Sequence, residues 1–296
     1  MTIANRAAIA MLVAVAMFAL MDAGLKQLSA HYPPFQVAFL RAAASLPLVV
    51  PWALWTAPRG SLRRPRWSLQ LLRTAIGMTM MGSFIFAVSH LPLSTTYAIF
   101  FVAPLLITAL SVPLLKERVG PRRWAAIGIG LVGVMVVLRP TGDGLLLMPA
   151  LATLLAAFCY ALSAITVRFL ARTDNTQSMM LWLLVLMTLG NAVIAFPSWV
   201  PLQMSDAWTI AFVGVAGALG QYAITEAFRT GEASALAPLE YTALLWGVLL
   251  DLSLWGVLPD GMTWLGAAII VASGLYLVRR ERLVAGPAVA LPAEHP

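Results

Sequence analysis

The chain has 296 residues, of which 61% are hydrophobic and 10% are charged, and it carries a formal net charge of +7. This composition excludes a soluble globular domain and indicates a polytopic α-helical protein embedded in a lipid bilayer. The single cysteine, Cys159, excludes an internal disulfide.

Ten apolar stretches of about 20 residues follow one another, each long enough to cross a bilayer as a helix. They lie near residues 6–28, 34–55, 69–89, 92–114, 122–139, 145–168, 177–199, 207–228, 232–255 and 262–279. The loops between them are short, so we expect no soluble domain, and the tail 283–296 is expected to be disordered. A signal peptide is the alternative for the first stretch, but Asp22 and Lys26 do not suit its cleavage region.

Most of the 19 lysines and arginines fall on one side of this ten-span topology. The other side has only Lys26 and Arg139, and Arg41 lies within a span. By the positive-inside rule, both termini are predicted to be cytoplasmic, in the inner membrane. This placement explains the basic charge through topology, so no nucleic-acid partner is expected.

In the first two spans, Asp22 and Lys26 are four residues apart and can neutralise each other. Arg41 lies at about the depth of Asp22, and a lone arginine at that depth is expensive. We therefore expect an Asp22–Arg41 contact. It would be either a structural ion pair or part of a gate on the extracellular side.

The fourth span, within residues 91–118, carries its non-aliphatic side chains on one helical face. These residues, spaced three or four apart, are Ser94, Tyr97, Phe101, Pro104, Thr108 and Ser111. Such a stripe suits a helix that faces a cavity. The alternative is that the hydroxyls bond to neighbouring helices or to their own carbonyls. Pro104 predicts a kink, because it leaves the carbonyl one turn earlier without its amide donor.

Four other spans add polar or aromatic faces, whereas spans 5, 7 and 10 are nearly free of them and are expected to face lipid. The additional cavity candidates are Thr79, Ser83, Phe86, His90, Tyr160, Ser163, Gln221, Tyr222, Glu240, Tyr241 and Trp246. An intramembrane carboxylate such as Glu240 serves proton coupling or binds a substrate amine, or is buried in its protonated form. His90 is a structural residue or a proton relay. Aromatic and hydroxyl side chains together suit small amphipathic solutes, with no cofactor or metal.

The chain contains a weak internal repeat at an offset of 140 residues. Residues 87–94 compare with 227–234, and Trp124 compares with Trp264. Two five-helix halves, 1–142 and 143–282, follow from this offset. Because five is odd, the second half is inverted, which is the architecture of secondary transporters with a site at the interface of the halves.

Several motifs resemble the drug/metabolite transporter superfamily in its EamA-type branch. They are Pro104 with Lys116-Glu117-Arg118, the glycine-rich fifth span, Lys26, Arg168, Arg41 and Leu239-Glu240-Tyr241. The resemblance covers residues 6–282, and the pattern is most similar to the YddG-type aromatic amino acid exporters. The chain departs from the family in having Tyr241 where a proline is common and no glutamate near Val257.

The resemblance implies that helices 1, 3, 4, 6, 8 and 9 surround a central cavity. We therefore expect a monomeric alternating-access exporter of aromatic or other neutral amino acids, with helix breaks at Pro104 and Pro238. The alternatives are a broad exporter or facilitator of lipophilic compounds, a channel, or an intramembrane enzyme. Three histidines, one cysteine and the absence of a hydrolase motif disfavour the enzyme. Proton coupling and facilitated transport both stay open.

Overall fold

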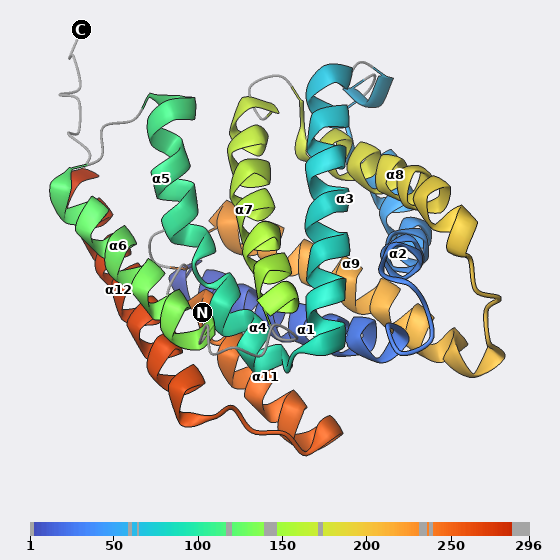
Figure 1. Cartoon of the computed structure of the whole chain (residues 1–296). Coiled ribbons are helices and arrows are strands. Elements are labelled where there is room, and N and C mark those ends of the chain that lie inside the picture. The colour runs from blue at the N-terminus through green and yellow to red at the C-terminus, as the bar shows by residue number, and fades with distance from the viewer. Residues whose placement is uncertain are drawn as a thin grey trace, which may run out of the picture.

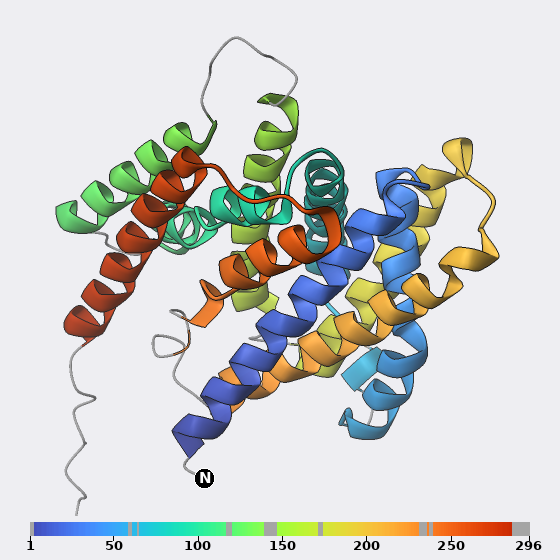
Figure 2. The same ribbon diagram turned by 90° about the horizontal axis from the view of Figure 1, so that it is seen from below.

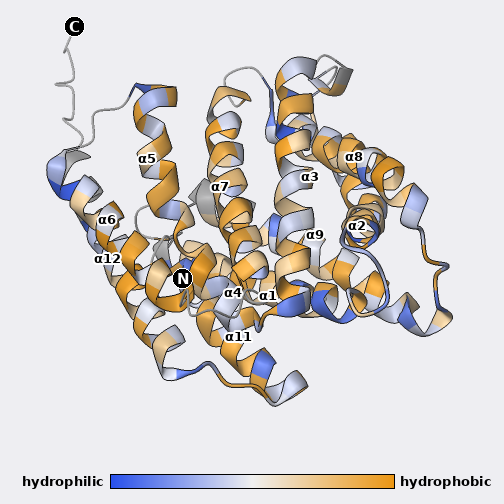
Figure 3. Cartoon of the chain, in the orientation of Figure 1, coloured by the Kyte–Doolittle hydropathy of each residue, from blue (hydrophilic) through white to orange (hydrophobic). Residues whose placement is uncertain are grey.

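The computed structural model describes residues 3–58, 61–63, 65–116, 120–138, 147–170, 174–230, 236 and 239–285. Within these residues the regular structure is entirely helical, and nine helices are long and apolar enough to cross a membrane. A tenth, shorter apolar segment covers Ala243–Trp255. Apolar residues cover most of the length of the helices, and hydrophilic ones gather near their ends (Figure 3). The predicted all-α membrane fold is confirmed.

The first five spans are built from six helices (Figure 1). These helices are α1 (Ile3–Leu28), α2 (Pro34–Thr56), α3 (Trp67–His90), α4 (Leu93–Phe100), α5 (Ala103–Leu115) and α6 (Pro121–Leu138). The fourth span is shared by α4 and α5. The short helical turn η1 (Ser61–Arg63) lies between α2 and α3.

The second five spans include α7 (Leu147–Leu170), α8 (Thr176–Ala195), α9 (Ala207–Thr230), α11 (Ala243–Leu250) and α12 (Gly261–Ala285). A π-helical segment, Asp251–Trp255, continues α11. Residues 283–285 of the predicted tail belong to α12, and residues 286–296 lie outside the described part of the chain. The predicted boundary between the halves, at residues 142 and 143, also lies outside it.

The packing of the helices has an internal symmetry. Helix α1 packs on α9 and α3 packs on α7, while α2 packs on α8, α6 on α12 and α4 on α11. Each span in one half has a counterpart five spans away in the other half. When every span is replaced by its counterpart, the α1–α9 pair becomes the α7–α3 pair. The α2–α8, α6–α12 and α4–α11 pairs stay the same. Figure 2 shows α1 and α9 running side by side. This pattern is the one that two inverted five-helix repeats produce around a pseudo-twofold axis.

Small residues allow the peripheral pair α6 and α12 to approach closely. A Cβ atom on Gly266 of α12 would lie 2.7 Å from the carbonyl oxygen of Gly133 on α6. Glycine removes this conflict, and close backbone approach of this kind is a principal source of helix association in membranes.

Both halves contain a helix break at the same place in the repeat. The first break lies at Phe101 and Val102, between α4 and α5, with Pro104 in the first turn of α5. The second lies at Tyr241 and Thr242, just before α11. The two turns are 140 residues apart, so the repeat offset predicted from sequence places one break on the other. The kink expected at Pro104 is confirmed as a full interruption, while Pro238 lies outside the described residues.

The broken helices divide the molecule into two unlike ends. Helix α4 packs on α11, whereas α5 leaves this pair and packs on α7 and α6. In Figure 1, α5 stands apart from α11 and points away from the α4–α11 contact. One end of the bundle therefore holds α4, α11 and Lys26. We call it the Lys26 end.

Candidate functional site

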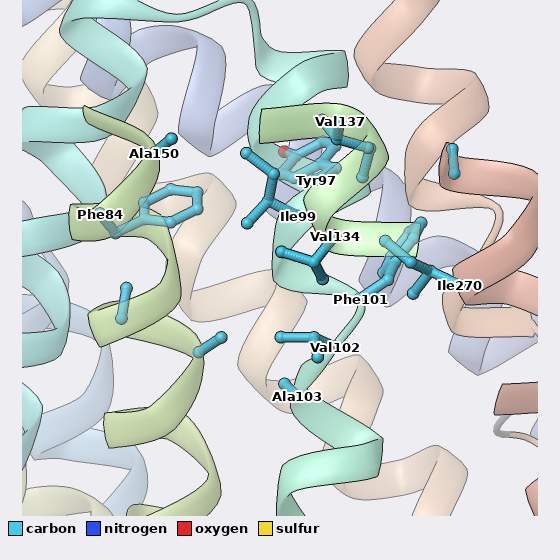
Figure 4. Packing of buried hydrophobic residues seen from close by; sticks show 14 of the residues in the cluster. Phe84, Tyr97, Ile99, Phe101, Val102, Ala103, Val134, Val137, Ala150 and Ile270 are labelled. Carbon is cyan, nitrogen blue, oxygen red and sulfur yellow. The ribbon is translucent and has the colours of Figure 1, made fainter. Parts of the chain in front are cut away.

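The two helix breaks meet through their aromatic side chains. The ring centroids of Phe101 and Tyr241 are 5.0 Å apart, with the planes at 81°, an edge-to-face contact. Figure 4 shows Phe101 beside Ile270 of α12, with Val102 and Ala103 where the chain leaves α4. Trp246 packs against the same cluster of buried residues. The predicted candidates Phe101 and Tyr241 are thus in contact where the two breaks meet, and Trp246 belongs to the same apolar cluster.

The Tyr241 ring is held from its far side by α12. A Cβ atom on Gly274 would overlap the Tyr241 hydroxyl, so this hydroxyl lies against a position where only glycine leaves room. The hydroxyl oxygen is buried and has no hydrogen-bond partner in the described part of the chain. Tyr241 is therefore fixed as an aromatic wall whose hydroxyl points away from the other break.

A second group of aromatic residues joins α3, α4 and α7. Phe100 contacts Phe84 at 5.8 Å between centroids and Tyr160 at 5.5 Å. The charge of Glu240 acts on both Tyr160 and Tyr241, so this acid lies near both of them. Its side chain is partly buried and forms no ion pair within the described residues. Aromatic surfaces and one uncompensated carboxylate are thus gathered beside the breaks.

At the Lys26 end, Asp251 closes the amino end of α4. Its carboxylate accepts hydrogen bonds from the backbone amides of Leu93 (2.9 Å) and Ser94 (2.8 Å) and from the Ser94 hydroxyl (2.6 Å). The first amides of a helix lack partners within it and carry a partial positive charge. A fully buried carboxylate from the other half of the molecule satisfies them here.

Lys26 completes the contact from α1. Its ammonium lies 3.6 Å from Asp251 Oδ1, donates a hydrogen bond of 2.8 Å to the Leu91 carbonyl and sits 4.6 Å from the centre of the Trp255 ring. Three elements, α1, the start of α4 and the π-helical segment after α11, therefore meet at one carboxylate. We call Lys26, Ser94 and Asp251, with the amides of Leu93 and Ser94, the seal.

Close backbone approach supports the seal from within. A Cβ atom on Gly247, one turn before Asp251, would lie 2.8 Å from the Tyr97 ring and 3.2 Å from the Ser94 backbone. The Tyr97 hydroxyl, three residues after Ser94, donates a hydrogen bond of 2.8 Å to Asp22. Tyr97 thereby links α4 to α1 through a buried hydrogen bond next to the seal.

Two expected ion pairs of the first two spans are not formed. Lys26 pairs with Asp251 and not with Asp22, because α11 brings a carboxylate to it from across the bundle. Within the described residues, Asp22 and Arg41 do not come within ion-pairing distance. Asp22 receives the Tyr97 hydroxyl, and the Arg41 Nε donates to the Met21 sulfur at 3.2 Å. The positive charge of Arg41 acts on Asp22 at longer range.

Several predicted cavity residues lie elsewhere. Thr79 lines a cleft of about 570 Å³ between α3 and α8, among apolar side chains such as Met78 and Leu189. Tyr222 belongs to an exposed stripe that includes Trp208 and Leu219 and runs the length of α9, away from its packing face on α1. These two placements follow from helix rotation, which side-chain spacing along one helix does not determine.

The hydroxyls of the fourth span divide between two functions. Ser94 lies in the seal, while Thr108 donates to the Pro104 carbonyl (3.2 Å) and Ser111 to the Thr108 carbonyl (2.9 Å). Thr108 and Ser111 therefore follow the alternative considered above, in which hydroxyls bond to carbonyls of their own helix.

The remaining candidates are placed without forming a common group. His90 is exposed, and its Nδ1 bonds to the Phe86 carbonyl within the same helix. The partly buried ones are Ser83, Ser163 and Gln221.

The loops at the Lys26 end are also tied together. Asp206 accepts a hydrogen bond from the Tyr32 hydroxyl at 2.8 Å and lies 2.9 Å from the His31 Nδ1. Burial, together with the Asp206 charge, raises the pKa of Tyr32, so its hydroxyl stays protonated and remains a donor. The Tyr32 oxygen in turn accepts from the Gln203 amide. The loop after α1 is thereby fastened to the loop before α9.

Asp251 was missed as a site residue by the sequence reasoning. Glu240, Gly247 and Asp251 have the spacing of one continuous helical face, but the break at Tyr241 and Thr242 separates Glu240 from the other two. The signal available in the sequence was that Asp251 lies near the end of its span, at about the same depth as Lys26 in another span. Within the described residues, no group of three or more histidine, cysteine or acidic side chains is placed to hold a metal ion.

Known proteins resemble this chain over nearly its whole length. It is 31% identical to a riboflavin transporter of Vibrio cholerae over 289 residues, covering 93% of this chain and 96% of the relative. It is 23% identical to the pseudopaline exporter CntI of Pseudomonas aeruginosa, covering 90% and 93%. A solved crystal structure has the same fold, with a TM-score of 0.64 at 19% identity, covering 94% of this chain and 99% of that one.

A family model supplies the classification and reproduces the two halves. The model of the EamA-like transporter family matches residues 5–139 and again residues 147–279. These two matches contain the paired helices and the two breaks described above. The chain is therefore a member of the EamA-like transporter family, in the drug/metabolite transporter superfamily, and a membrane transporter.

Proposed function

We propose that this protein carries small solutes with a flat aromatic ring across the cytoplasmic membrane by alternating access, with riboflavin as the leading substrate. The observation that carries the proposal is the edge-to-face contact of Phe101 and Tyr241, where the two helix breaks meet. A flat ring can insert beside these walls and stack on them. A relative of 31% identity named a riboflavin transporter supports the choice of solute.

The binding site in this proposal consists of Phe101, Tyr241 and Trp246, with Tyr160 and Glu240 at its margin. Both halves of one chain supply it, so a monomer is sufficient. The Lys26 end faces the outside, because the basic residues gather at the opposite end of the spans. The closed arrangement then has its sealed end toward the outside.

Aromatic amino acids are the second candidate, and export is the direction expected for them. Glu240 favours this class, because a partly buried carboxylate without an ion-pair partner among the described residues can bind a substrate ammonium group. Riboflavin has a flat ring system and hydroxyl groups but no ammonium group. Glu240 is therefore needed to bind aromatic amino acids but not to bind riboflavin.

Flux through proteoliposomes distinguishes the two substrates. We expect labelled riboflavin to enter protein-containing vesicles at a saturable rate and to be carried by Glu240→Gln within about twofold of the unmodified rate. If an aromatic amino acid is the substrate, Glu240→Gln should lower its flux about tenfold, the effect of losing one charged hydrogen bond or ion pair. Vesicles without protein provide the background. An absence of saturable flux for both solutes would refute the proposal.

The same vesicles test energy coupling. A proton-coupled transporter requires an acid that binds and releases protons, so a pH gradient should accelerate flux in the unmodified protein and lose its effect in Glu240→Gln. A facilitator should show equal initial rates with and without the gradient. Counterflow of unlabelled solute, measured at equal pH, excludes a channel.

A further inference from the structure

The seal joins residues that are distant in sequence at one buried carboxylate. Asp251 and Ser94 are both fully buried, and the carboxylate has three donors from α4 and one ammonium from α1. An isolated carboxylate in this position would be costly, whereas this one is compensated on both oxygens. The start of α4 cannot leave α11 unless these partners separate.

The residue that the repeat pairs with Asp251 has a different chemistry. The offset of 140 residues that superposes the two breaks pairs Asp251 with Ser111 on α5. Ser111 is buried, and its hydroxyl donates to the carbonyl of Thr108 in its own helix. A neutral serine whose hydrogen is already used cannot attract helix amides and a lysine as a carboxylate does. Ser111 therefore does not repeat the contact that Asp251 makes with α4 and Lys26.

We infer that Asp251 is a latch that holds the Lys26 end closed and biases the transporter toward the conformation sealed at this end. The inference rests on the proposed alternating-access function, and adds to it the residue that sets the preferred state. Asp251 is a positioning residue: it acts through the amino end of α4 and Lys26, not through contact with substrate. The π-helical segment Asp251–Trp255 carries it, and such segments concentrate at functional positions.

Opening at this end requires α4 to move with its break as a hinge. Helix α4 has eight residues and ends at Phe100, next to Phe101, so displacement of its amino end is transmitted to the Phe101–Tyr241 contact. The close approach of Gly247 to Ser94 and Tyr97 is lost when the two helices separate. Release of Asp251 is thereby linked to the geometry of the proposed substrate site.

Cysteine labelling tests the latch without any substrate. The native Cys159 is replaced by alanine, and a single reporter cysteine is placed at Ala23, which is 6% exposed and lies beside the seal in the cluster that includes Leu93 and Tyr97. A membrane-impermeant methanethiosulfonate reagent is applied to sealed vesicles, and the labelling rate is measured. We expect Asp251→Asn to raise this rate about tenfold, as a shift of the equilibrium toward the open end.

A control comes from a second aspartate that also accepts a hydrogen bond from a backbone amide at the amino end of a helix, but is exposed. Asp260 accepts a hydrogen bond of 2.8 Å from the Thr263 amide at the start of α12, outside the seal. Asp260→Asn should leave the labelling rate of the Ala23 cysteine within about twofold. Equal acceleration by both substitutions would show general loosening and would overturn the latch.

Two milder variants keep the test decisive if Asp251→Asn does not fold. Ser94→Ala removes one of the donors to Asp251, and Lys26→Met removes the ammonium while keeping a side chain of similar length. We expect each to raise labelling about threefold, and the two together to exceed either alone. Unchanged labelling in both single variants, with the protein monodisperse, would refute the inference.

The outcomes separate this inference from the proposed substrate. Accelerated labelling in Asp251→Asn with no flux of riboflavin or amino acids supports the latch and rejects the substrate. Saturable flux with unchanged labelling rejects the latch and keeps the substrate.

Discussion

Phe101→Ala is expected to lower the saturable flux of the aromatic substrate by about tenfold or more. The Phe101 ring is the part of the first break that meets Tyr241 of the second, at 5.0 Å between centroids. Loss of one aromatic stacking partner costs about 1–3 kcal/mol, which corresponds to a change of roughly 5- to 150-fold in an equilibrium constant. Initial rates in proteoliposomes, normalised to the amount of reconstituted protein, measure the effect.

The symmetric substitution and a peripheral control complete this experiment. Tyr241→Ala should cause a loss similar to that of Phe101→Ala, since each ring faces the other across the pseudo-twofold axis. Phe212→Ala removes a ring of the same size that is 47% exposed on the outer stripe of α9, and it should leave flux within about twofold. Normal flux in both Phe101→Ala and Tyr241→Ala would show that the substrate binds elsewhere.

Gly266→Leu is expected to destabilise the protein by about 2–4 kcal/mol, or to prevent its accumulation in the membrane. A Cβ atom at position 266 would lie 2.7 Å from the Gly133 carbonyl oxygen and 3.0 Å from the Val137 amide nitrogen. Both are backbone atoms, so relief requires α6 and α12 to separate, with loss of their packing. Overpacking of this kind costs about 1–3 kcal/mol even where side chains can adjust.

A second glycine offers the comparison that isolates packing from helix propensity. Gly128 lies in α6, and a Cβ atom there would have no neighbour within 4 Å. Gly128→Leu should therefore keep or slightly raise the melting temperature in detergent, because leucine is the better helix former. Equal melting temperatures for Gly266→Leu and Gly128→Leu would show that the α6–α12 contact does not contribute to stability.

The pairing of the helices is compatible with the proposed alternating access. Because α1–α9 and α3–α7 are equivalent under exchange of the halves, a rearrangement in which each half adopts the other's geometry keeps most contacts. The contacts that such an exchange must break are those without an equivalent. In the latch proposed above, the Asp251 seal is such a contact, because the repeat places Ser111 at the position of the carboxylate.

Much of the fold was predictable because a bilayer leaves few choices. Backbone groups in lipid must be satisfied within helices, so apolar length alone indicates the spans. The offset of 140 between the halves and the proline at position 104 located the first break, and the same offset identifies its partner at Tyr241 and Thr242. These features depend on the local sequence and on the number of spans, not on the rotation of each helix about its own axis.

The partners of the charged residues were not predictable in the same way. Spacing along one helix pairs Asp22 with Lys26, and equal depth pairs Asp22 with Arg41, yet Lys26 binds Asp251 and Asp22 binds Tyr97. Thr79 shows the same limit, since it lies in a cleft between α3 and α8. Which side chains meet across helices depends on rotation about each axis, and periodicity fixes only the relative positions of residues on one helix.

The sequence by itself thus determined that the chain spans a membrane in two inverted halves, with a broken helix at Pro104 in the first. Apolar length, the odd number of spans per half and the chemistry of proline suffice for that. Only the tertiary structure decided that the breaks meet through Phe101 and Tyr241, and that Asp251 holds the amino end of α4. These contacts join residues about 140 to 160 positions apart, and their geometry arises from helix packing as a whole, which no local pattern encodes.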